Sequence, residues 1–270
     1  MYLSRHRAAG GARWALDGHY LPQDFTLERL LEVRATDVRG FIEERAPGEA
    51  ARGPSLPPVE PGHEIWASGV TYLRSREARE IESTDADAYE RVYDAERPEL
   101  FFKALGWRAV GHGDRVRVRG DSRWNVPEPE LVLIVNSGME VVGYTAGNDV
   151  SSRDIEGENP LYLPQAKVYD GACSLGPGIV LCGPDSMLDL RITMSVRRGG
   201  EIVFEDAVDT SQMKRSPGEL ADFLGRELAF PDGVFLMTGT GIVPEDDFTL
   251  GSGDLVWISV GDLVLENEVA

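Results

Sequence analysis

Two glutamates on either side of a proline are the strongest chemical signal in the sequence. Glu128 and Glu130 stand directly before the apolar run 131–135. Residues i and i+2 of an extended segment point to the same face, so the two carboxylates are expected to lie side by side. Neighbouring carboxylates resist ionisation unless a cation lies between them. The pair therefore indicates a cation site, and the alternative is a solvated acidic edge.

A third carboxylate, Asp149, lies at the end of the next predicted strand, directly after the run 139–148. The Ser-Gly pair between the two strands predicts a hairpin, and adjacent strands can bring Asp149 to Glu128 and Glu130. Three oxygen ligands that leave positions open for water suit Mg²⁺, with Mn²⁺ as a second possibility.

Lys167 is a candidate cation or base, because the sequence has few lysines and this one lies among apolar residues, with Asp170 three positions later. A surface lysine on a loop is the alternative.

The segment 238–241, Thr-Gly-Thr-Gly, follows a predicted strand and could bind a carboxylate through backbone amides and hydroxyls. A simple strand-ending turn would explain it equally well.

Composition narrows the classes of protein. The 270 residues carry a formal net charge of −19, which disfavours nucleic acid and anionic membrane surfaces as partners. Two cysteines give no disulfide framework, and the apolar runs are too short to span a bilayer. We expect a reduced, cytoplasmic protein. The sequence has no P-loop, GxGxxG, GxSxG or HExxH motif, and its four histidines do not cluster.

The chain divides at a proline-rich stretch, residues 51–62, which reads as an extended linker. Residues 1–60 are predicted to form a small α/β appendage, with helices over 26–33 and 37–45 and a possible cap at Asp24 or Thr26. Residues 61–270 would form the catalytic domain.

Strands dominate the predicted catalytic domain from residue 110 onward. Gly199-Gly200 marks a second hairpin, and a helix is expected over 216–228 because Ser216, Pro217 and Glu219 fit a capped first turn. The pattern favours a mostly β (α+β) fold with a curled or barrel-like sheet.

These fragments together resemble the fumarylacetoacetate hydrolase superfamily. The residues that carry the resemblance are GYTAGNDVSSRD (143–154), Glu-x-Glu at 128–130, Lys167 and Asp170 ahead of SLGPGIV, and Thr-Gly-Thr at 238–240. Their order and spacing match over residues 64–269. The resemblance implies a rolled mixed β-sheet domain, a homodimer or homotetramer, and a 2-oxo acid substrate. It also implies a divalent metal on Glu128, Glu130 and Asp149, and roles for Arg153 and Thr240 in holding substrate or ordering the site.

Departures from the usual pattern point to one branch. Hydrolases of this superfamily carry a water-activating histidine in the segment that corresponds to residues 69–80, and here that segment has none. Glu156 stands where several relatives have glutamine. Three longer stretches, 65–79, 91–104 and 158–171, resemble the sugar-acid dehydratase branch, with Phe102 and Lys103 as candidate substrate contacts.

The expected reaction is Mg²⁺-dependent dehydration of a 2-dehydro-3-deoxy-pentonate to 2,5-dioxopentanoate in oxidative pentose degradation. Lys167 would remove a C3 proton with Asp170 tuning it, and Glu99 or Glu156 would protonate the leaving hydroxyl. A Schiff base on Lys167 is a less economical route. Other 2-oxo acid enzymes, namely an acylpyruvate hydrolase, an oxaloacetate decarboxylase or a hydratase, remain alternatives, as does a non-catalytic 2-oxo acid binding protein.

Overall fold

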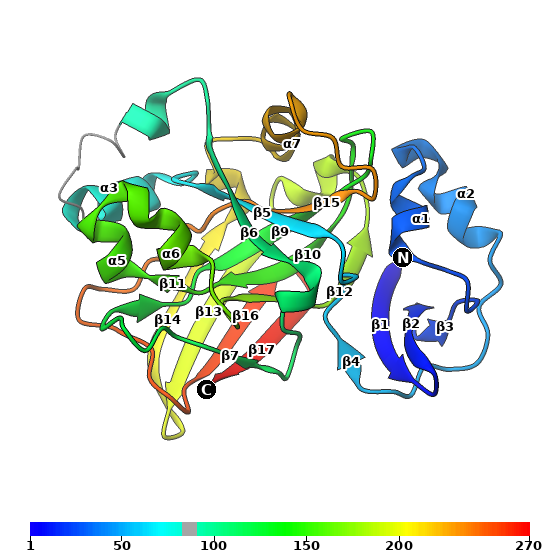
Figure 1. Ribbon diagram of the computed structural model, residues 1–270, viewed down its shortest axis with the longest axis horizontal. Helices are drawn as coiled ribbons and strands as arrows, with labels where there is room; N and C mark the ends of the chain where they lie inside the picture. Colours follow the sequence, from blue (N-terminus) through cyan, green and yellow to red (C-terminus); the bar gives the residue numbers. More distant parts are fainter. Residues whose placement is uncertain (83–90) are drawn as a thin grey trace.

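The fold is built from two β-sheets that pack around a common core, with helices at the edges and outer faces (Figure 1). The structure is a computed structural model and describes residues 1–82 and 91–270. Most strand pairs are antiparallel, whereas β15–β5 and β17–β7 are parallel. The prediction of a mostly β fold with mixed sheets is confirmed.

The larger sheet has ten strands in the described part of the chain. In spatial order they are β3 (His19–Tyr20), β2 (Gly11–Leu16), β1 (Tyr2–Ala8), β12 (Cys173–Leu181), β10 (Val141–Asp149), β9 (Pro129–Val135), β15 (Val234–Met237), β5 (Glu64–Gly69) and β6 (Glu99–Leu105), with β4 (Ser55–Leu56) paired to β1. Strand β9 lies between β10 and β15 and is buried along its whole length.

The smaller sheet has the order β14 (Glu201–Asp209), β13 (Arg191–Arg198), β16 (Leu255–Val260), β17 (Leu263–Val269) and β7 (Arg115–Val116). A separate two-stranded ribbon joins β11 (Ser151–Ser152) to β8 (Asn125–Val126). Both predicted hairpins are present, as β9–β10 and β13–β14.

Helices cover the edges of the sheets and carry the caps that the sequence indicates. They are α1 (Leu27–Leu31), α2 (Val38–Glu43), α3 (Leu73–Glu82), α5 (Arg153–Glu158), α6 (Leu163–Lys167) and α7 (Pro217–Gly225). Short 3₁₀ segments lie at Ala35–Asp37, Gly106–Arg108, Pro160–Tyr162, Pro184–Met187 and Thr210–Gln212. The hydroxyls of Thr26 and Ser216 accept from backbone N–H groups in the first turns of α1 and α7, so Thr26, not Asp24, caps α1.

Strand β9 sends alternate side chains into two different cores. Leu131 and Leu133 pack in a core with Ile192 of β13 and Ile258 of β16, between the two sheets. The intervening side chains of β9 pack in a second core that also contains residues of α1 and α2. This alternation explains why every residue of the strand is apolar after Glu130.

The first 60 residues are tied closely to the rest of the chain. Strand β1 pairs with β12, and the predicted linker contains β4, which pairs with β1. Strands make up more of this segment than predicted, since β1 and β2 have seven and six residues. The division of the chain into two domains at residue 60 stays a prediction.

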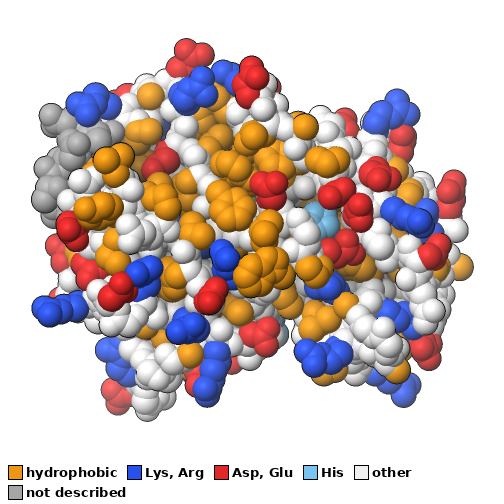
Figure 2. Space-filling view, in the orientation of Figure 1, with side chains coloured by type: hydrophobic (Ala, Val, Ile, Leu, Met, Phe, Trp, Pro, Cys, Tyr) orange, Lys and Arg blue, Asp and Glu red, His pale blue; other side chains and the backbone are white. Residues whose placement is uncertain are grey.

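The surface shows charges of both signs. On the face in Figure 2, acidic and basic side chains surround a more apolar middle, and no broad basic area is visible there. Among the described residues, no helix has the length and apolar character needed to cross a membrane.

We expect Leu30→Ala to destabilise the whole molecule by about 2–5 kcal/mol, because Leu30 of α1 is fully buried in the core shared with β9. Unfolding in urea, followed by near- and far-ultraviolet circular dichroism, should show one transition shifted to lower denaturant. Leu228→Ala is the matched control, since Leu228 is 45% exposed. A separate early transition that leaves the remainder folded would contradict the shared core.

Candidate metal and active site

The β9–β10 hairpin brings three carboxylates together. Gly147 of β10 pairs with Glu130, and the Asp149 backbone N–H donates to the Glu128 carbonyl at 3.0 Å. One ligand oxygen from each of Glu128, Glu130 and Asp149 lies within 4.8 Å of the others, and all three residues are buried. The carboxylates therefore meet because of strand register, as the sequence predicts.

Glu130 lies in an unfavourable electrostatic position. Burial, followed by the charges of Asp149 and Glu128, raises the pKa of Glu130 well above its usual value. The Lys167 ammonium and a hydrogen bond from the Gly239 backbone N–H, 2.6 Å from Glu130 Oε2, act in the opposite direction. A second positive charge at this point would offset the repulsion that remains.

Gly239 can make this contact because of its backbone conformation. Its φ is +86°, and a Cβ there would lie 2.3 Å from Thr71 Oγ1 and 2.9 Å from the Ser68 carbonyl oxygen. A side chain at this position would displace the backbone amide. In the Thr-Gly-Thr segment after β15, the backbone therefore lies close to a carboxylate of the protein itself, that of Glu130.

Lys167, the last residue of α6, reaches into the cluster. Its ammonium donates to Glu128 Oε2 at 2.8 Å, Asp149 Oδ2 at 3.1 Å and Ser151 Oγ at 2.6 Å. The nitrogen also lies 5.8 Å from the ring centre of Phe101. Lys167 therefore contacts two of the three carboxylates directly.

Arg153 and Glu156 form a second ion pair beside the cluster. Both lie on α5, and Arg153 Nη1 lies 2.8 Å from Glu128 Oε1 and 2.9 Å from Glu156 Oε2. Both residues are buried. Arg153 thus links the carboxylate cluster to the helix that carries Glu156.

Lys103 is buried behind the cluster. Its ammonium pairs with Asp149 Oδ1, and it donates to the backbone carbonyl of Val150 at 3.3 Å and to the carbonyl of Lys167. Its side chain is 0% exposed. Lys103 contacts groups that build the site, but its side chain does not line the small cavity beside the cluster.

A small cavity of about 20 Å³ opens onto the cluster. Its described walls are Ser68, Gly69, Val70, Ser75, Glu99, Phe101, Glu128, Glu156, Leu163, Lys167, Gly239 and Thr240. This volume holds an ion or a water molecule, whereas ligand pockets usually measure ~300–1,000 Å³. Side chains must therefore move when a larger ligand enters.

Two predicted site residues lie elsewhere. The side chain of Asp170 is 72% exposed and pairs with Arg108 at 3.3 Å. Helix α6 ends at Lys167, so the three-residue spacing does not place Asp170 on the same face. Phe102 packs its ring edge-on against Trp66, 6.0 Å between centres, and does not line the cavity.

Two contributors, Phe101 and Ser151, were not singled out from the sequence. Phe101, not Phe102, lines the cavity, and strand alternation with Glu99 could have indicated this. Ser151 holds the Lys167 ammonium. The Gly239 amide, in the segment that was expected to bind a carboxylate, holds Glu130. The structure brings the remaining predicted residues to the cluster or the cavity, with Glu99 and Thr240 in the cavity wall.

The donor set fits a small divalent cation. All three candidate ligands are carboxylate oxygens, the donors that Mg²⁺ and Mn²⁺ prefer. The buried charged side chains of the described site are four acids and three bases: Glu128, Glu130, Asp149, Glu156, Lys103, Arg153 and Lys167. If all are ionised, one negative charge remains. A dication would reverse that sign and favour a monoanionic ligand.

The fold and the site together define a family. Residues 64–270 match the family described as "Fumarylacetoacetate (FAA) hydrolase C-terminal", so the chain belongs to the fumarylacetoacetate hydrolase family. Within it, the chain is 52% identical over 216 residues to a Haloferax volcanii protein named "Probable 2-keto-3-deoxyxylonate dehydratase", covering 78% of this chain and 73% of that protein.

Two further relatives carry related names. The 2-dehydro-3-deoxy-D-arabinonate dehydratase of Saccharolobus solfataricus is 44% identical over 211 residues, which cover 76% of this chain and 70% of that protein. A solved structure of 2-keto-3-deoxy-D-arabinonate dehydratase, complexed with magnesium and 2,5-dioxopentanoate, superposes with a TM-score of 0.82. It is 35% identical, with coverage of 100% of this chain and 98% of that one.

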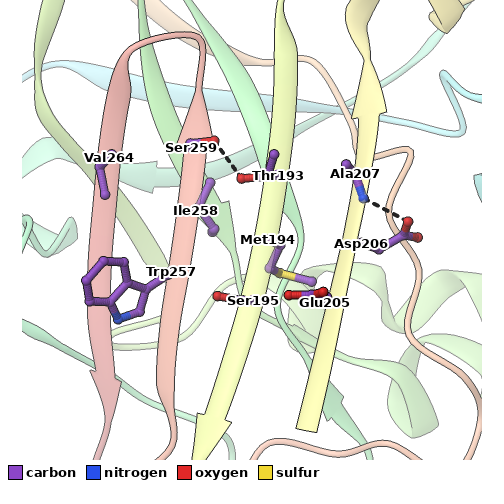
Figure 3. A pocket seen from close by; sticks show the side chains of 10 residues that line it. All are labelled: Thr193, Met194, Ser195, Glu205, Asp206, Ala207, Trp257, Ile258, Ser259 and Val264. Atoms are coloured by element: carbon purple, nitrogen blue, oxygen red, sulfur yellow. Dashed lines mark hydrogen bonds between the residues drawn. The ribbon is translucent and has the colours of Figure 1, made fainter. Parts of the chain in front are cut away.

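A wider hollow of about 520 Å³ lies on the outer face of the smaller sheet (Figure 3). Its walls come from β13, β14, β16 and β17 and include Trp257, Thr193 and Glu205. No histidine, lysine or arginine is among its lining residues, and it shares none with the carboxylate cluster. The predicted catalytic residues Lys167, Glu99 and Glu156 line the smaller cavity and not this hollow.

At neutral pH the metal-free Glu130→Gln variant is expected to melt at a higher temperature than the unmodified protein. A glutamate whose pKa is raised on folding favours the folded state at acid pH and opposes it as pH rises through the folded-state pKa. The difference in melting temperature between the variant and the unmodified protein should therefore shrink as pH falls. Mg²⁺ should raise the melting temperature of the unmodified protein and much less that of the variant.

Glu140→Gln is a control in which the change in stability at neutral pH should have the opposite sign. Hydrogen bonds from the Ala35 N–H and Asn136 lower the pKa of Glu140, so its replacement should reduce stability at neutral pH. Differential scanning fluorimetry with EDTA or Mg²⁺, across acid to neutral pH, makes the comparison. Equal Mg²⁺ stabilisation of Glu130→Gln and the unmodified protein would exclude Glu130 as a ligand.

Proposed function

We propose that the protein is a Mg²⁺-dependent hydro-lyase that converts a 2-dehydro-3-deoxy-pentonate to 2,5-dioxopentanoate. The observation that carries this proposal is the contact between the Lys167 ammonium and two carboxylates of an oxygen-only cluster. The names of the relatives and their identity to this chain support the substrate class. The charge balance of the site supports an anionic substrate.

Lys167 is the proposed base. A divalent cation bound among the three carboxylates supplies a Lewis acid that polarises the 2-oxo group and acidifies the C3 protons. Positive charge beside the Lys167 nitrogen favours its neutral amine form, which can accept a proton from C3. Ser151 and Phe101 hold the nitrogen toward the cavity. Thr240 lines the same cavity and is proposed to contact the substrate.

Glu99 is the proposed acid for the leaving hydroxyl. Glu156 is held by Arg153 in an ion pair at 2.9 Å. Glu99 lines the same cavity from β6. Its proton would join the C4 hydroxyl, which leaves as water when the electrons of the broken C3–H bond form the new double bond. The unsaturated acid then rearranges by proton transfers to 2,5-dioxopentanoate.

Water activation for carbon–carbon cleavage has weaker support. Segment 69–80 has no histidine, and the described cavity wall contains Ser75 of α3 but no histidine. Elimination needs only a base and an acid, both of which the cavity offers. Dehydration is therefore favoured over hydrolysis of acylpyruvates.

We expect dehydration of 2-dehydro-3-deoxy-pentonates and little or no cleavage of acylpyruvates at saturating Mg²⁺. Product formation from both substrate types is measured side by side by chromatography, with and without excess EDTA. Acylpyruvate cleavage that outpaces dehydration would reject the proposed reaction. Full activity in EDTA would reject the proposed metal.

Lys167→Met should retain Mg²⁺ and pyruvate binding but lose at least about 100-fold in turnover, the usual contribution of a positioned base. Exchange of C3 protons in D₂O, followed by NMR, isolates the step. Lys214→Met is the matched control, because Lys214 lies at the surface and pairs with Asp94 at 2.8 Å. Unchanged exchange in Lys167→Met would assign the base to another residue, and a borohydride-trapped adduct on Lys167 would indicate an imine.

The assembly and location of the protein stay predictions. We propose a homodimer or homotetramer in the cytoplasm, on the basis of the family to which the chain belongs. Size-exclusion chromatography with light scattering measures the assembly directly.

A further inference from the structure

Each of the three clustered carboxylates has one oxygen held from outside the cluster. Lys103 pairs with Asp149 Oδ1, and the Gly239 N–H donates to Glu130 Oε2 at 2.6 Å. Arg153 Nη1 lies 2.8 Å from Glu128 Oε1. Three donors from three separate elements therefore engage one oxygen of each acid.

The second oxygens of two of these acids face a common point. Glu128 Oε2 and Asp149 Oδ2 share the Lys167 ammonium, at 2.8 and 3.1 Å. A cation bound between these two acids would replace the Lys167 ammonium as the partner of Oε2 and Oδ2, while Arg153 and Lys103 keep the other oxygen of each acid. The arrangement resists two-oxygen binding by any single carboxylate.

A limit of one oxygen per carboxylate affects Mg²⁺ and Ca²⁺ differently, because the two ions differ in size. Mg²⁺ requires near-octahedral coordination at about 2.0–2.1 Å and keeps several waters, which single oxygens from three acids satisfy. Ca²⁺ takes six to eight oxygens at about 2.3–2.6 Å and often binds both oxygens of a carboxylate. A site limited to one oxygen per acid should therefore favour the smaller ion.

Lys103 is a charged and fully buried member of the three outer donors. Its side chain is 0% exposed and its ammonium contacts Asp149 and the carbonyls of Val150 and Lys167. It therefore fixes the carboxylate and also the end of the helix that carries the proposed base. Its ammonium therefore combines one ion pair with two hydrogen bonds to backbone carbonyls.

The use of lysine here is selective. Only three of the 27 Lys and Arg residues in the sequence are lysines, and Lys103 and Lys167 are two of them. An ammonium is a compact point charge, whereas a guanidinium is a wide planar fork. Two of the three lysines therefore lie in this one site, where a compact cation contacts buried oxygens.

We propose that Lys103 is a positioning residue that sets metal selectivity: by holding Asp149 Oδ1, it restricts Asp149 to one-oxygen coordination and favours Mg²⁺ over Ca²⁺. This inference rests on the metal site of the proposed function. It assigns Lys103 no contact with substrate.

The test is Lys103→Met, with Mg²⁺ and Ca²⁺ affinities measured by isothermal titration calorimetry without substrate. Loss of one positive charge should strengthen both dications similarly, so the ratio of the two dissociation constants isolates geometry from charge. We expect this ratio to shift toward Ca²⁺ by about tenfold, which is the low end of the change in metal affinity that loss of an outer partner of a metal ligand causes. Lys214→Met should leave the ratio unchanged.

An unchanged ratio in folded Lys103→Met would overturn the proposal. In a separate titration of the Mg²⁺-loaded protein with pyruvate, a loss of pyruvate affinity alone would also overturn it, because it would indicate direct ligand contact. Arg153→Met removes the equivalent donor from Glu128 and should shift the ratio in the same direction, so it decides the matter if Lys103→Met does not fold. Failure of the unmodified protein to bind Mg²⁺ would instead reject the proposed metal. Normal Mg²⁺ binding without dehydration would reject only the proposed reaction.

Discussion

Mutual repulsion among three buried carboxylates is the constraint on which the rest of the site depends. Glu128, Glu130 and Asp149 offer oxygens within 4.8 Å of one another in a region with little water. Such a group is costly unless each charge is compensated. The surrounding donors compensate it in part, a bound cation would offset the remainder, and the donors come from separate elements of the chain. Those donors also fix the orientation of every carboxylate.

The larger sheet fixes the positions of the three carboxylates, because the β9–β10 hairpin that contains them lies in the interior of the protein. Strand β9 is paired on both sides and packs against a core on each face, so its register cannot slip without moving apolar side chains into the wrong core. The buried ion pairs themselves are weak evidence for stability, since removal from water offsets most of their attraction. The two apolar cores stabilise the fold, and the ion pairs specify geometry within it.

The same contacts link the proposed base to the proposed metal. Lys167 shares Glu128 and Asp149 with the point where a cation would bind, so the charge that draws a dication also positions the amine. Lys103 joins Asp149 to the backbone of Lys167 and couples the two positions. A site of this kind favours proton removal beside a polarised carbonyl, which is the chemistry of elimination.

The sequence alone determined the three carboxylates, their hairpin and Lys167, because strand period and turn residues are local properties that short segments reveal. It also indicated the family, whose motifs are contiguous. Only the tertiary structure decided which other side chains belong to the site. Asp170 turns outward because α6 ends before it, and Phe102 lies on the opposite face of β6 from Phe101. The partners of Lys103 are more than 40 residues away in sequence, and only packing brings such distant groups together.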